Sequence, residues 1–274
     1  EDEIYRGVPA SAKSSSIRGR SKPRCATQNE KKGARRKVYD DLRVRAPLVV
    51  RADGRGFGKL LRKANKPYDL EFARAMATAA RAFVEGSGLA PAIAFTFSDE
   101  VSLLFGEAPF NGRLEKIDSV VAGSLSGLLS IGLGKAVAMD ARSIPLCPEE
   151  VVEYFAARQD EAWRNHVFSS GFYALVAEGF APREAMGRLR GMKEAEIHEM
   201  LFRRGANLAK SPAWQRRGIL IRRVWVGDEI GDAGGEGTGG EEKRARTKIV
   251  EEWEPPLFRS EEGRRILDGT IRNR

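Results

Sequence analysis

The chain has 274 residues, with 47 Lys or Arg against 38 Asp or Glu, so its formal net charge is +9. Hydrophobic residues make up 42% of it and no apolar run reaches membrane-spanning length, which excludes fibrous and mainly disordered proteins and predicts a soluble, cytoplasmic protein with no membrane partner. Two cysteines are too few for a disulfide framework, so we expect free, buried thiols.

Positive charge is concentrated near the N-terminus. Residues 4–39 hold eleven Lys or Arg and one acid, Glu30, and they lack apolar periodicity. We therefore predict a basic, flexible extension over residues 1–37. A nucleic acid is a plausible partner for it, because neutralised phosphates release counterions; a solvated tail is the alternative.

Residues 38–145 predict a catalytic core. Apolar runs and periodicities favour strands at 48–50, 92–97, 101–105 and 136–139, and helices at 69–86 and 113–131. Asp69 is a suitable N-cap for the first of these helices. The resulting β-α-β-β-α-β order is typical of an α+β, ferredoxin-like fold of the kind found in polymerase palm domains.

Residues 146–274 predict a helical region followed by a hairpin. Helices are expected from Pro148 to about Glu178, from Pro182, and over 193–204. Strands at 219–226 and 245–250 then flank residues 227–240, which contain seven glycines. We expect this half to complete the catalytic domain and to carry a mobile glycine-rich loop.

Two carboxylates stand at matching strand ends. Asp53 follows the first predicted strand, and Asp99 lies in the hairpin between the second and third. Each alone fits an ordinary turn, but adjacent strands would bring both side by side. Oxygen ligands of this kind suit Mg²⁺, and a pair of ions suits in-line displacement on a nucleotide triphosphate.

A glycine-rich turn follows the first carboxylate. The run from Gly54 to Gly58 lacks the third glycine of a dinucleotide fingerprint and does not match a phosphate loop. The turn formed by Gly54, Arg55 and Gly56 nevertheless lets backbone amides approach phosphates without interference from a Cβ atom.

Cationic side chains cluster at two places in the second half. Those on the long helix, with one amide beside them, are Arg158, Arg164 and Asn165; those near the following strand include Arg216 and Arg217. They are candidates for contacts with an RNA phosphate backbone, and a solvated face is the alternative.

Several motifs in register resemble the tRNA(His) guanylyltransferase family over roughly residues 38–268, with the later motifs closer to its archaeal branch. The matching segments are 49–57, 65–69, 97–105, 140–142, 158–159, 163–166, 199–202 and 212–218. The resemblance implies a palm domain working in reverse, which adds nucleotides to the 5′ end of tRNA. It further implies activation of a 5′-monophosphate with ATP, attack by the 3′-hydroxyl of GTP, two Mg²⁺ ions and a homotetramer.

The same resemblance assigns residues to the site. Asp53, the Gly54 carbonyl and Asp99 correspond to metal ligands, and Glu100 to a supporting catalytic acid. Lys66 corresponds to a triphosphate contact. The residues that would surround the nucleotide are Asp53, Gly54, Arg55, Gly56, Phe57, Gly58, Ser98 and Asp99.

Departures from the family pattern favour a templated reaction. Gly58 stands where eukaryotic members carry a histidine, and residues 163–169 replace a eukaryotic helix motif, keeping one asparagine, Asn165. These changes suit addition by Watson–Crick pairing and repair of truncated 5′ ends. Two alternatives stay open: a palm-type nucleotide cyclase, whose signature hairpin is similar to residues 98–104, and a catalytically silent tRNA-binding protein.

Overall fold

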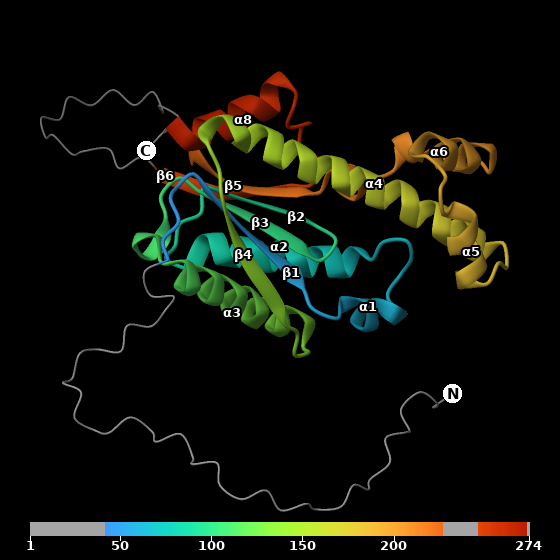
Figure 1. Cartoon of the computed structure of the whole chain (residues 1–274), viewed down its shortest axis with the longest axis horizontal. Coiled ribbons are helices and arrows are strands. Elements are labelled where there is room, and N and C mark those ends of the chain that lie inside the picture. The colour runs from blue at the N-terminus through green and yellow to red at the C-terminus, as the bar shows by residue number, and fades with distance from the viewer. Residues whose placement is uncertain (1–41, 227–245, 273–274) are drawn as a thin grey trace, which may run out of the picture. The chain divides into compact units, whose positions relative to one another are not determined.

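A computed structural model of the chain describes residues 42–226 and 246–272, which fold around one six-stranded sheet (Figure 1). The strand order is β4-β1-β3-β2-β5-β6, and all neighbouring strands are antiparallel. The strands are β1 (Leu48–Gly54), β2 (Ile93–Phe97), β3 (Glu100–Phe105), β4 (Met139–Pro145), β5 (Ile219–Val226) and β6 (Arg246–Glu252). The predictions for residues 1–37 and 227–240 lie outside the described residues.

The helices follow the predicted order and add short elements that the sequence pattern did not reveal. They are α1 (Phe57–Leu60), α2 (Leu70–Gly86), α3 (Leu114–Leu133), α4 (Val151–Ala177), α5 (Pro182–Leu189), α6 (Glu194–Arg203), α7 (Ala213–Arg217) and α8 (Glu261–Arg272), with 3-10 turns at Leu61–Lys63, Pro109–Gly112, Pro148–Glu150 and Leu208–Lys210. The order β1-α2-β2-β3-α3-β4 confirms the predicted α+β, ferredoxin-like palm fold.

Helices α2 and α3 cover one face of the sheet (Figure 1). Helix α2 begins where the Asp69 side chain accepts a hydrogen bond from the Phe72 amide, as the N-cap prediction requires. Its apolar stripe, which includes Phe72, Met76 and Phe83, is buried against the sheet. Full burial of a side chain such as Phe83 contributes about 2–3 kcal/mol.

Helix α3 packs on the same face through Ile117, Val121, Leu125 and Leu129, each four residues from the last and each buried. By length and composition alone, α3 would also qualify as a membrane-spanning helix, and it is the one such helix in the described part of the chain. The buried stripe gives its apolar residues a different explanation, because they form the core of the palm.

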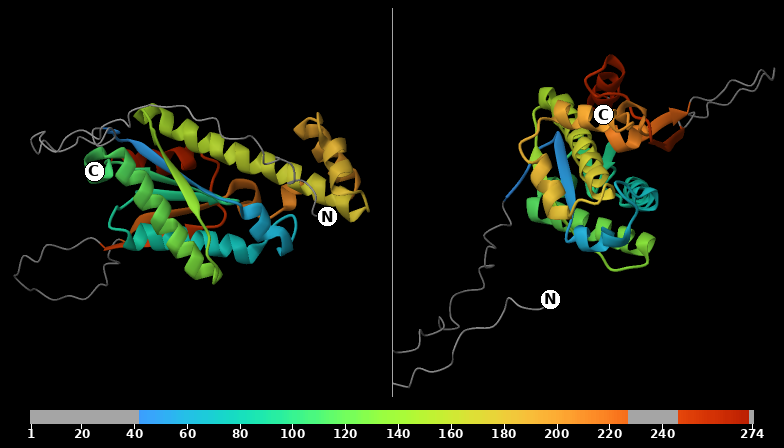
Figure 2. Two further views of the ribbon diagram at one scale, coloured as in Figure 1. Left: turned by 60° about the horizontal axis from the view of Figure 1, so that its bottom comes forward. Right: turned by 90° about the vertical axis from the view of Figure 1, so that its right-hand side faces the viewer.

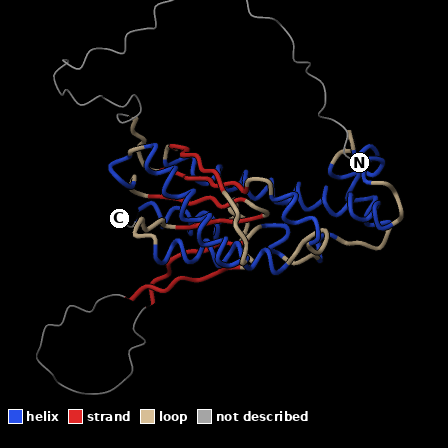
Figure 3. Tube along the Cα trace, turned by 90° about the horizontal axis from the view of Figure 1, so that it is seen from below, coloured by secondary structure: helices blue, strands red, loops and turns tan. Residues whose placement is uncertain are grey.

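Helices α4 and α8 cover the opposite face (Figure 1). Helix α4 runs past the end of the sheet and carries α5 and α6 there, which Figure 2 shows from two other sides. In Figure 3 this end of the molecule contains helices and loops but no strand among the residues drawn in colour. It has its own apolar cluster, which includes Val167, Leu189 and Leu201.

Strands β5 and β6 extend the palm sheet beyond β2. Gly218 precedes β5 with a φ of 75°, and a Cβ atom there would lie 2.6 Å from the Phe95 ring. Only glycine fits this position, because any side chain would require Phe95 to move. The second half of the chain therefore completes the sheet of the first half, with β5 paired to β2.

Two predictions about local structure are wrong. The strand expected at 136–139 begins only at Met139, since Ala136 to Ala138 form the loop before it. The short apolar run was misleading because β4 is an edge strand, whose charged Asp140 and Arg142 give a weak apolar signal. Cys147 is an exposed free thiol, not a buried one, and Cys25 lies outside the described residues.

Candidate active site

Three neighbouring strands place polar side chains on one face of the sheet. Asp53 on β1 lies opposite Glu100 on β3 and Asp140 on β4. Arg51, two residues earlier, lies opposite Ser102 and Arg142 in the same way. Because alternate residues of a strand share a face, these six side chains form a polar grid on the side covered by α4.

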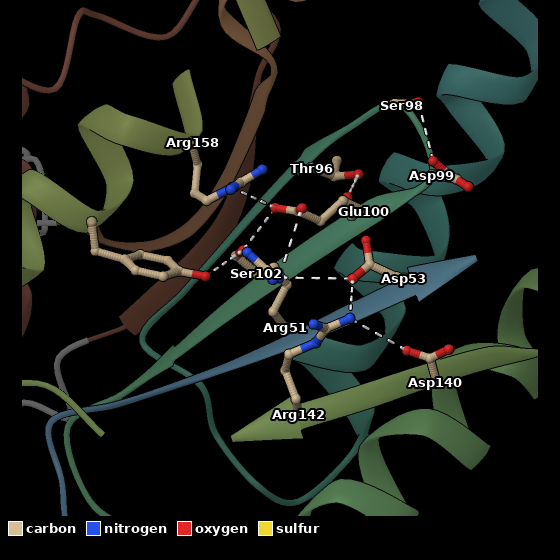
Figure 4. Close-up of polar contacts among 11 residues, drawn as sticks. Arg51, Asp53, Thr96, Ser98, Asp99, Glu100, Ser102, Asp140, Arg142 and Arg158 are labelled. Carbon is tan, nitrogen blue, oxygen red and sulfur yellow. Dashed lines mark hydrogen bonds and ion pairs between the residues drawn. The ribbon is translucent and has the colours of Figure 1, made fainter. Parts of the chain in front are cut away.

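Asp53 is held by two arginines (Figure 4). Arg142 Nη2 lies 3.1 Å from Asp53 Oδ2, and Arg51 Nε lies 3.7 Å from the same oxygen. The Asp53 side chain keeps 34% of its surface exposed. Asp53 is thus held by two arginines and remains partly open to solvent, so its carboxylate is positioned to bind a cation.

Asp99 reaches the same end of the sheet from the turn between β2 and β3. Its backbone oxygen accepts a hydrogen bond of 3.0 Å from the Gly54 amide, which joins the turn to the end of β1. Ser98, with a φ of 51°, donates its hydroxyl to Asp99 Oδ1 at 3.1 Å. Burial raises the pKa of Asp99, and the nearby Asp53 charge raises it further.

Glu100 lies deeper and faces α4 (Figure 4). Its carboxylate receives Arg158 Nε at 3.0 Å and the Ser102 hydroxyl at 3.3 Å, and Arg51 Nε lies 3.9 Å away. Burial raises the pKa of Glu100, whereas the Arg158 and Arg51 charges oppose that shift. Glu100 therefore joins strand β3 to helix α4 and does not point to the open side of the site.

A pocket of about 170 Å³ opens beside Ser98, between α2, α4 and the loop that precedes α2. Asp69 orders that loop, because its carboxylate accepts hydrogen bonds from the amides of Asn65 and Phe72, each at 2.9 Å. Lys66 Nζ donates to the Leu61 carbonyl at 2.8 Å. The polar groups of the lining come from Asn65, Lys66, Tyr68, Asp69, Thr96, Ser98, Asn165, Ser169 and Gln215.

The glycine turn follows Asp53 in sequence and precedes the first residues of this pocket, and it has the open geometry expected from its glycines. A Cβ atom on Gly54 would lie 2.7 Å from the Phe57 ring, so glycine is needed there. Gly56 has a φ of 72° and, like Gly58, faces open space. The backbone at Gly56 and Gly58 is therefore accessible to a ligand.

The donor set fits a hard divalent cation. Asp53, Asp99 and the Gly54 carbonyl offer oxygen only, and the Gly54 amide is hydrogen-bonded to the Asp99 backbone oxygen, which holds the two carboxylate-bearing segments together. Within the described ranges no group of three His, Cys, Asp or Glu side chains could hold a metal ion. Mg²⁺ does not need one, because it binds through one or two carboxylates and keeps water or substrate phosphates as its other ligands.

The residues predicted to contact RNA are largely engaged within the protein. Arg158 pairs with Glu100, and Arg164 with Glu161. Arg216 Nε donates to the Ser211 carbonyl at 2.9 Å, and Arg217 Nη1 to the Pro255 carbonyl at 3.5 Å. Asn165 lines the pocket beside Ser98.

Three side chains of the site were missed by sequence reasoning: Arg51, Ser102 and Tyr154. The Tyr154 hydroxyl lies 3.4 Å from Ser102 Oγ, and Arg51 Nε is buried without a hydrogen bond among the described residues. The sequence does hold a signal for two of them, because residues two apart on a strand lie on the same face. Arg51 precedes Asp53 by two residues, and Ser102 follows Glu100 by two. Arg51, Ser102 and Arg142 all lie in segments that match the family, but the sequence analysis gave them no role.

Comparison with known proteins gives a consistent result. A family model described as "tRNAHis guanylyltransferase" matches residues 33–159. The tRNA(His) guanylyltransferase of Schizosaccharomyces pombe is 28% identical over 206 residues, which cover 70% of this chain and 77% of the yeast protein. An uncharacterized protein of Acanthamoeba polyphaga mimivirus is 32% identical over 116 residues, covering 36% of this chain and 39% of its own.

Solved structures share the fold. A bacterial tRNA(His) guanylyltransferase-like protein in complex with GTP superposes with a TM-score of 0.64 at 22% identity, covering 85% of this chain and 94% of that one. The tRNA(His) guanylyltransferase of Saccharomyces cerevisiae gives a TM-score of 0.58 at 23% identity, covering 63% and 83%.

Proposed function

We propose that this protein is a nucleotidyltransferase of the tRNA(His) guanylyltransferase family, which adds guanosine to the 5′ end of tRNA(His). The family match over residues 33–159 and the similarity to the Schizosaccharomyces pombe enzyme support this proposal. GTP is the nucleotide added and ATP the activator. The bacterial relatives whose structures hold GTP and ATP support this choice of nucleotides.

The observation that carries the proposal is the placement of Asp53 and Asp99 at one end of two adjacent strands. The hydrogen bond from the Gly54 amide to the Asp99 backbone fixes the turn against β1. The two carboxylates then lie beside a glycine turn and a pocket, as a nucleotide-binding site requires. Mg²⁺ held there by Asp53, Asp99 and the Gly54 carbonyl would neutralise phosphate charge and increase the acidity of the attacking hydroxyl.

The chain's own residues position the nucleotide. The open backbone at Gly56 and Gly58 suits the phosphates, and the Lys66 ammonium at the pocket edge adds positive charge. The purine occupies the pocket bounded by Ser98 and Asn65. Glu100 acts indirectly, because its contacts with Arg158 and Arg51 hold α4 and β1 around the site.

The proposed reaction runs in the 3′-5′ direction. The GTP 3′-hydroxyl oxygen forms a bond to the 5′ phosphorus of the tRNA, and a phosphoanhydride bond breaks. AMP leaves from an adenylated end, and pyrophosphate leaves from a triphosphate end. In this proposal a base on the opposite strand selects the added nucleotide, which also permits repair of truncated ends, and four copies of the chain form the active assembly.

The decisive experiment measures incorporation of labelled GTP, with Mg²⁺, into tRNA(His) transcripts that carry a 5′-monophosphate or a 5′-triphosphate. Each transcript is made with C or A at the discriminator position opposite the added residue. We expect incorporation opposite C alone and a requirement for ATP with the monophosphate alone. Incorporation opposite both bases would contradict templated addition, and a cyclic dinucleotide formed from GTP without RNA would contradict the whole assignment.

Two variants test the site itself. Asp53→Ala and Asp99→Ala should abolish incorporation while the circular dichroism spectrum stays that of the wild type. Glu184→Ala, at an exposed helix position in α5, is the matched loss of a carboxylate and should keep full activity. Full activity in either aspartate variant would exclude the proposed site.

A further inference from the structure

A second concave surface includes residues of the glycine turn and shares no lining residue with the nucleotide pocket. It has a volume of about 460 Å³ and is bounded by α1 and by the loop between α3 and β4, which lie beside each other in Figure 1. We call it the α1 groove. Its lining consists of Arg55, Gly56, Phe57, Lys59 and Leu60 on one side and Lys135 to Ala138 on the other.

The groove carries positively charged side chains that make no ion pair or hydrogen bond with other described residues. Residues 54–68 contain five Lys or Arg and no acid. Three cations line the groove, Arg55, Lys59 and Lys135, and all are exposed. Within residues 42–226 and 246–272, no ion pair or hydrogen bond of their side chains occurs, in contrast to Arg158 and Arg164.

The wall of the groove is ordered before any ligand binds. Ser130 Oγ accepts a hydrogen bond from the Val137 amide at 3.0 Å, and Ser126 Oγ accepts one from the Met139 amide at 2.8 Å. The Arg55 amide donates to the Ala138 carbonyl at 2.9 Å, which joins the two sides. A surface fixed in this way loses little conformational entropy on binding.

The shape and chemistry of the groove select one class of ligand. Small residues, Gly56, Ala136 and Ala138, leave room for a chain to lie across it. Its one aromatic residue, Phe57, is buried, so bases have no ring to stack on. Cations on two separate elements instead suit successive phosphates of a backbone.

We propose that the α1 groove binds the phosphodiester backbone of the RNA strand whose end is processed between Asp53 and Asp99. Arg55 is two residues from Asp53, so a strand held in the groove has its end close to the carboxylates. The proposal rests on the proposed function, but it concerns binding and does not require that transfer occur. In this proposal the principal RNA contact is the surface around α1, whereas the sequence analysis expected it at Arg158 and Arg164.

The test compares Lys59→Gln/Lys135→Gln with the wild type in full-length chain. The matched control is Lys210→Gln/Lys248→Gln, which removes two exposed lysines elsewhere. The probe is a tRNA(His) transcript with a 5′-monophosphate, titrated at several KCl concentrations, and GTP is titrated separately without RNA. We expect the groove variant to raise the tRNA Kd about tenfold and to reduce the salt slope by about 1 to 2, with GTP affinity unchanged.

The possible outcomes separate the proposals. Unchanged tRNA affinity and salt slope in the groove variant would overturn the inference, as would equal losses in the control variant. Weaker GTP binding with unchanged tRNA binding would assign the groove to nucleotide phosphates and also overturn it. Wild-type protein that binds tRNA but incorporates no GTP would refute the proposed function alone, since the effect of the groove variant on binding would still stand.

Discussion

His166 lies inside the protein, with 1% of its surface exposed. Its Nε2 atom lies 3.0 Å from Ser211 Oγ, and its ring lies 5.4 Å from that of Tyr68. Nδ1 has no hydrogen-bond partner among the described residues. Burial, assisted by the Arg216 charge, lowers the pKa of His166 from 6.5 to about 4. The neutral form is therefore the native one.

This histidine makes folding stability depend on pH. Between pH 6.5 and about 4 the unfolded chain binds a proton at His166 that the native chain does not, so stability falls as the pH falls through that window. Above pH 6.5 both states are neutral and the contribution is constant. The full loss amounts to about 3 kcal/mol, at 1.36 kcal/mol for each pKa unit. Urea unfolding at pH 7.5, 6 and 5 should show a shallower pH dependence for His166→Asn than for the wild type.

The matched control replaces the second histidine, His198, which is less buried and lies in α6. His198→Asn should leave the pH dependence between 7.5 and 5 at the wild-type slope. If His166→Asn and the wild type lose stability in parallel, His166 is not the group that titrates.

At the scale of elements, α4 is joined to the palm by polar contacts in its first half. Arg158 binds Glu100 on β3, and Tyr154 contacts Ser102 on the same strand. Gln159 donates to the carbonyls of Arg217 and Pro256 and accepts from the Phe258 amide. The helix that carries α5 and α6 is thus fixed against the catalytic strands by groups that are mostly buried.

A double-mutant cycle measures that attachment. Glu100→Gln and Arg158→Leu should each destabilise the protein by about 2 kcal/mol, because each removes a charged hydrogen bond of 3.0 Å from a largely buried pair, while Arg51 remains 3.9 Å from Glu100. The double variant should lose less than the sum, with a coupling energy above about 1 kcal/mol in urea unfolding. The same cycle on Glu184 and Arg188, an exposed pair four residues apart, should give less than about 0.5 kcal/mol. Additive losses at Glu100 and Arg158 would mean that the two side chains do not stabilise each other.

These elements also show what the sequence could predict. The helix at Leu70–Gly86 follows from apolar spacing and the Asp69 cap, and the hairpin with Asp99 follows from two apolar strands around a polar turn; both depend on local rules. The contact between Glu100 and Arg158 joins residues 58 positions apart, and no local pattern encodes it. Strand β4 was misplaced for a related reason, since an edge strand is defined by its neighbour β1 more than by its own apolar residues.

The distribution of charge along the chain bears on the RNA binding proposed above. Residues 1–37 carry eleven Lys and Arg against four acids, so seven of the nine net positive charges belong to this segment. The rest of the chain, Val38–Arg274, is therefore close to neutral overall, and the excess positive charge at the α1 groove is confined to that surface. Salt screens the attraction of a polyanion over a Debye length of about 8 Å at physiological ionic strength. We therefore expect residues 1–37 and the α1 groove to make separable contributions to RNA binding.

Removal of residues 1–37 tests that separation. The truncated protein should keep the wild-type urea midpoint, because the core that the structure describes is built from Leu48 onward. Its tRNA association should slow and its salt slope should decrease, since fewer phosphates are neutralised. Combined with Lys59→Gln/Lys135→Gln, the losses in binding free energy should add, as expected when the two regions neutralise different phosphates. Wild-type association rate and salt slope after truncation would identify residues 1–37 as a solvated tail and leave the described unit as the whole RNA-binding surface.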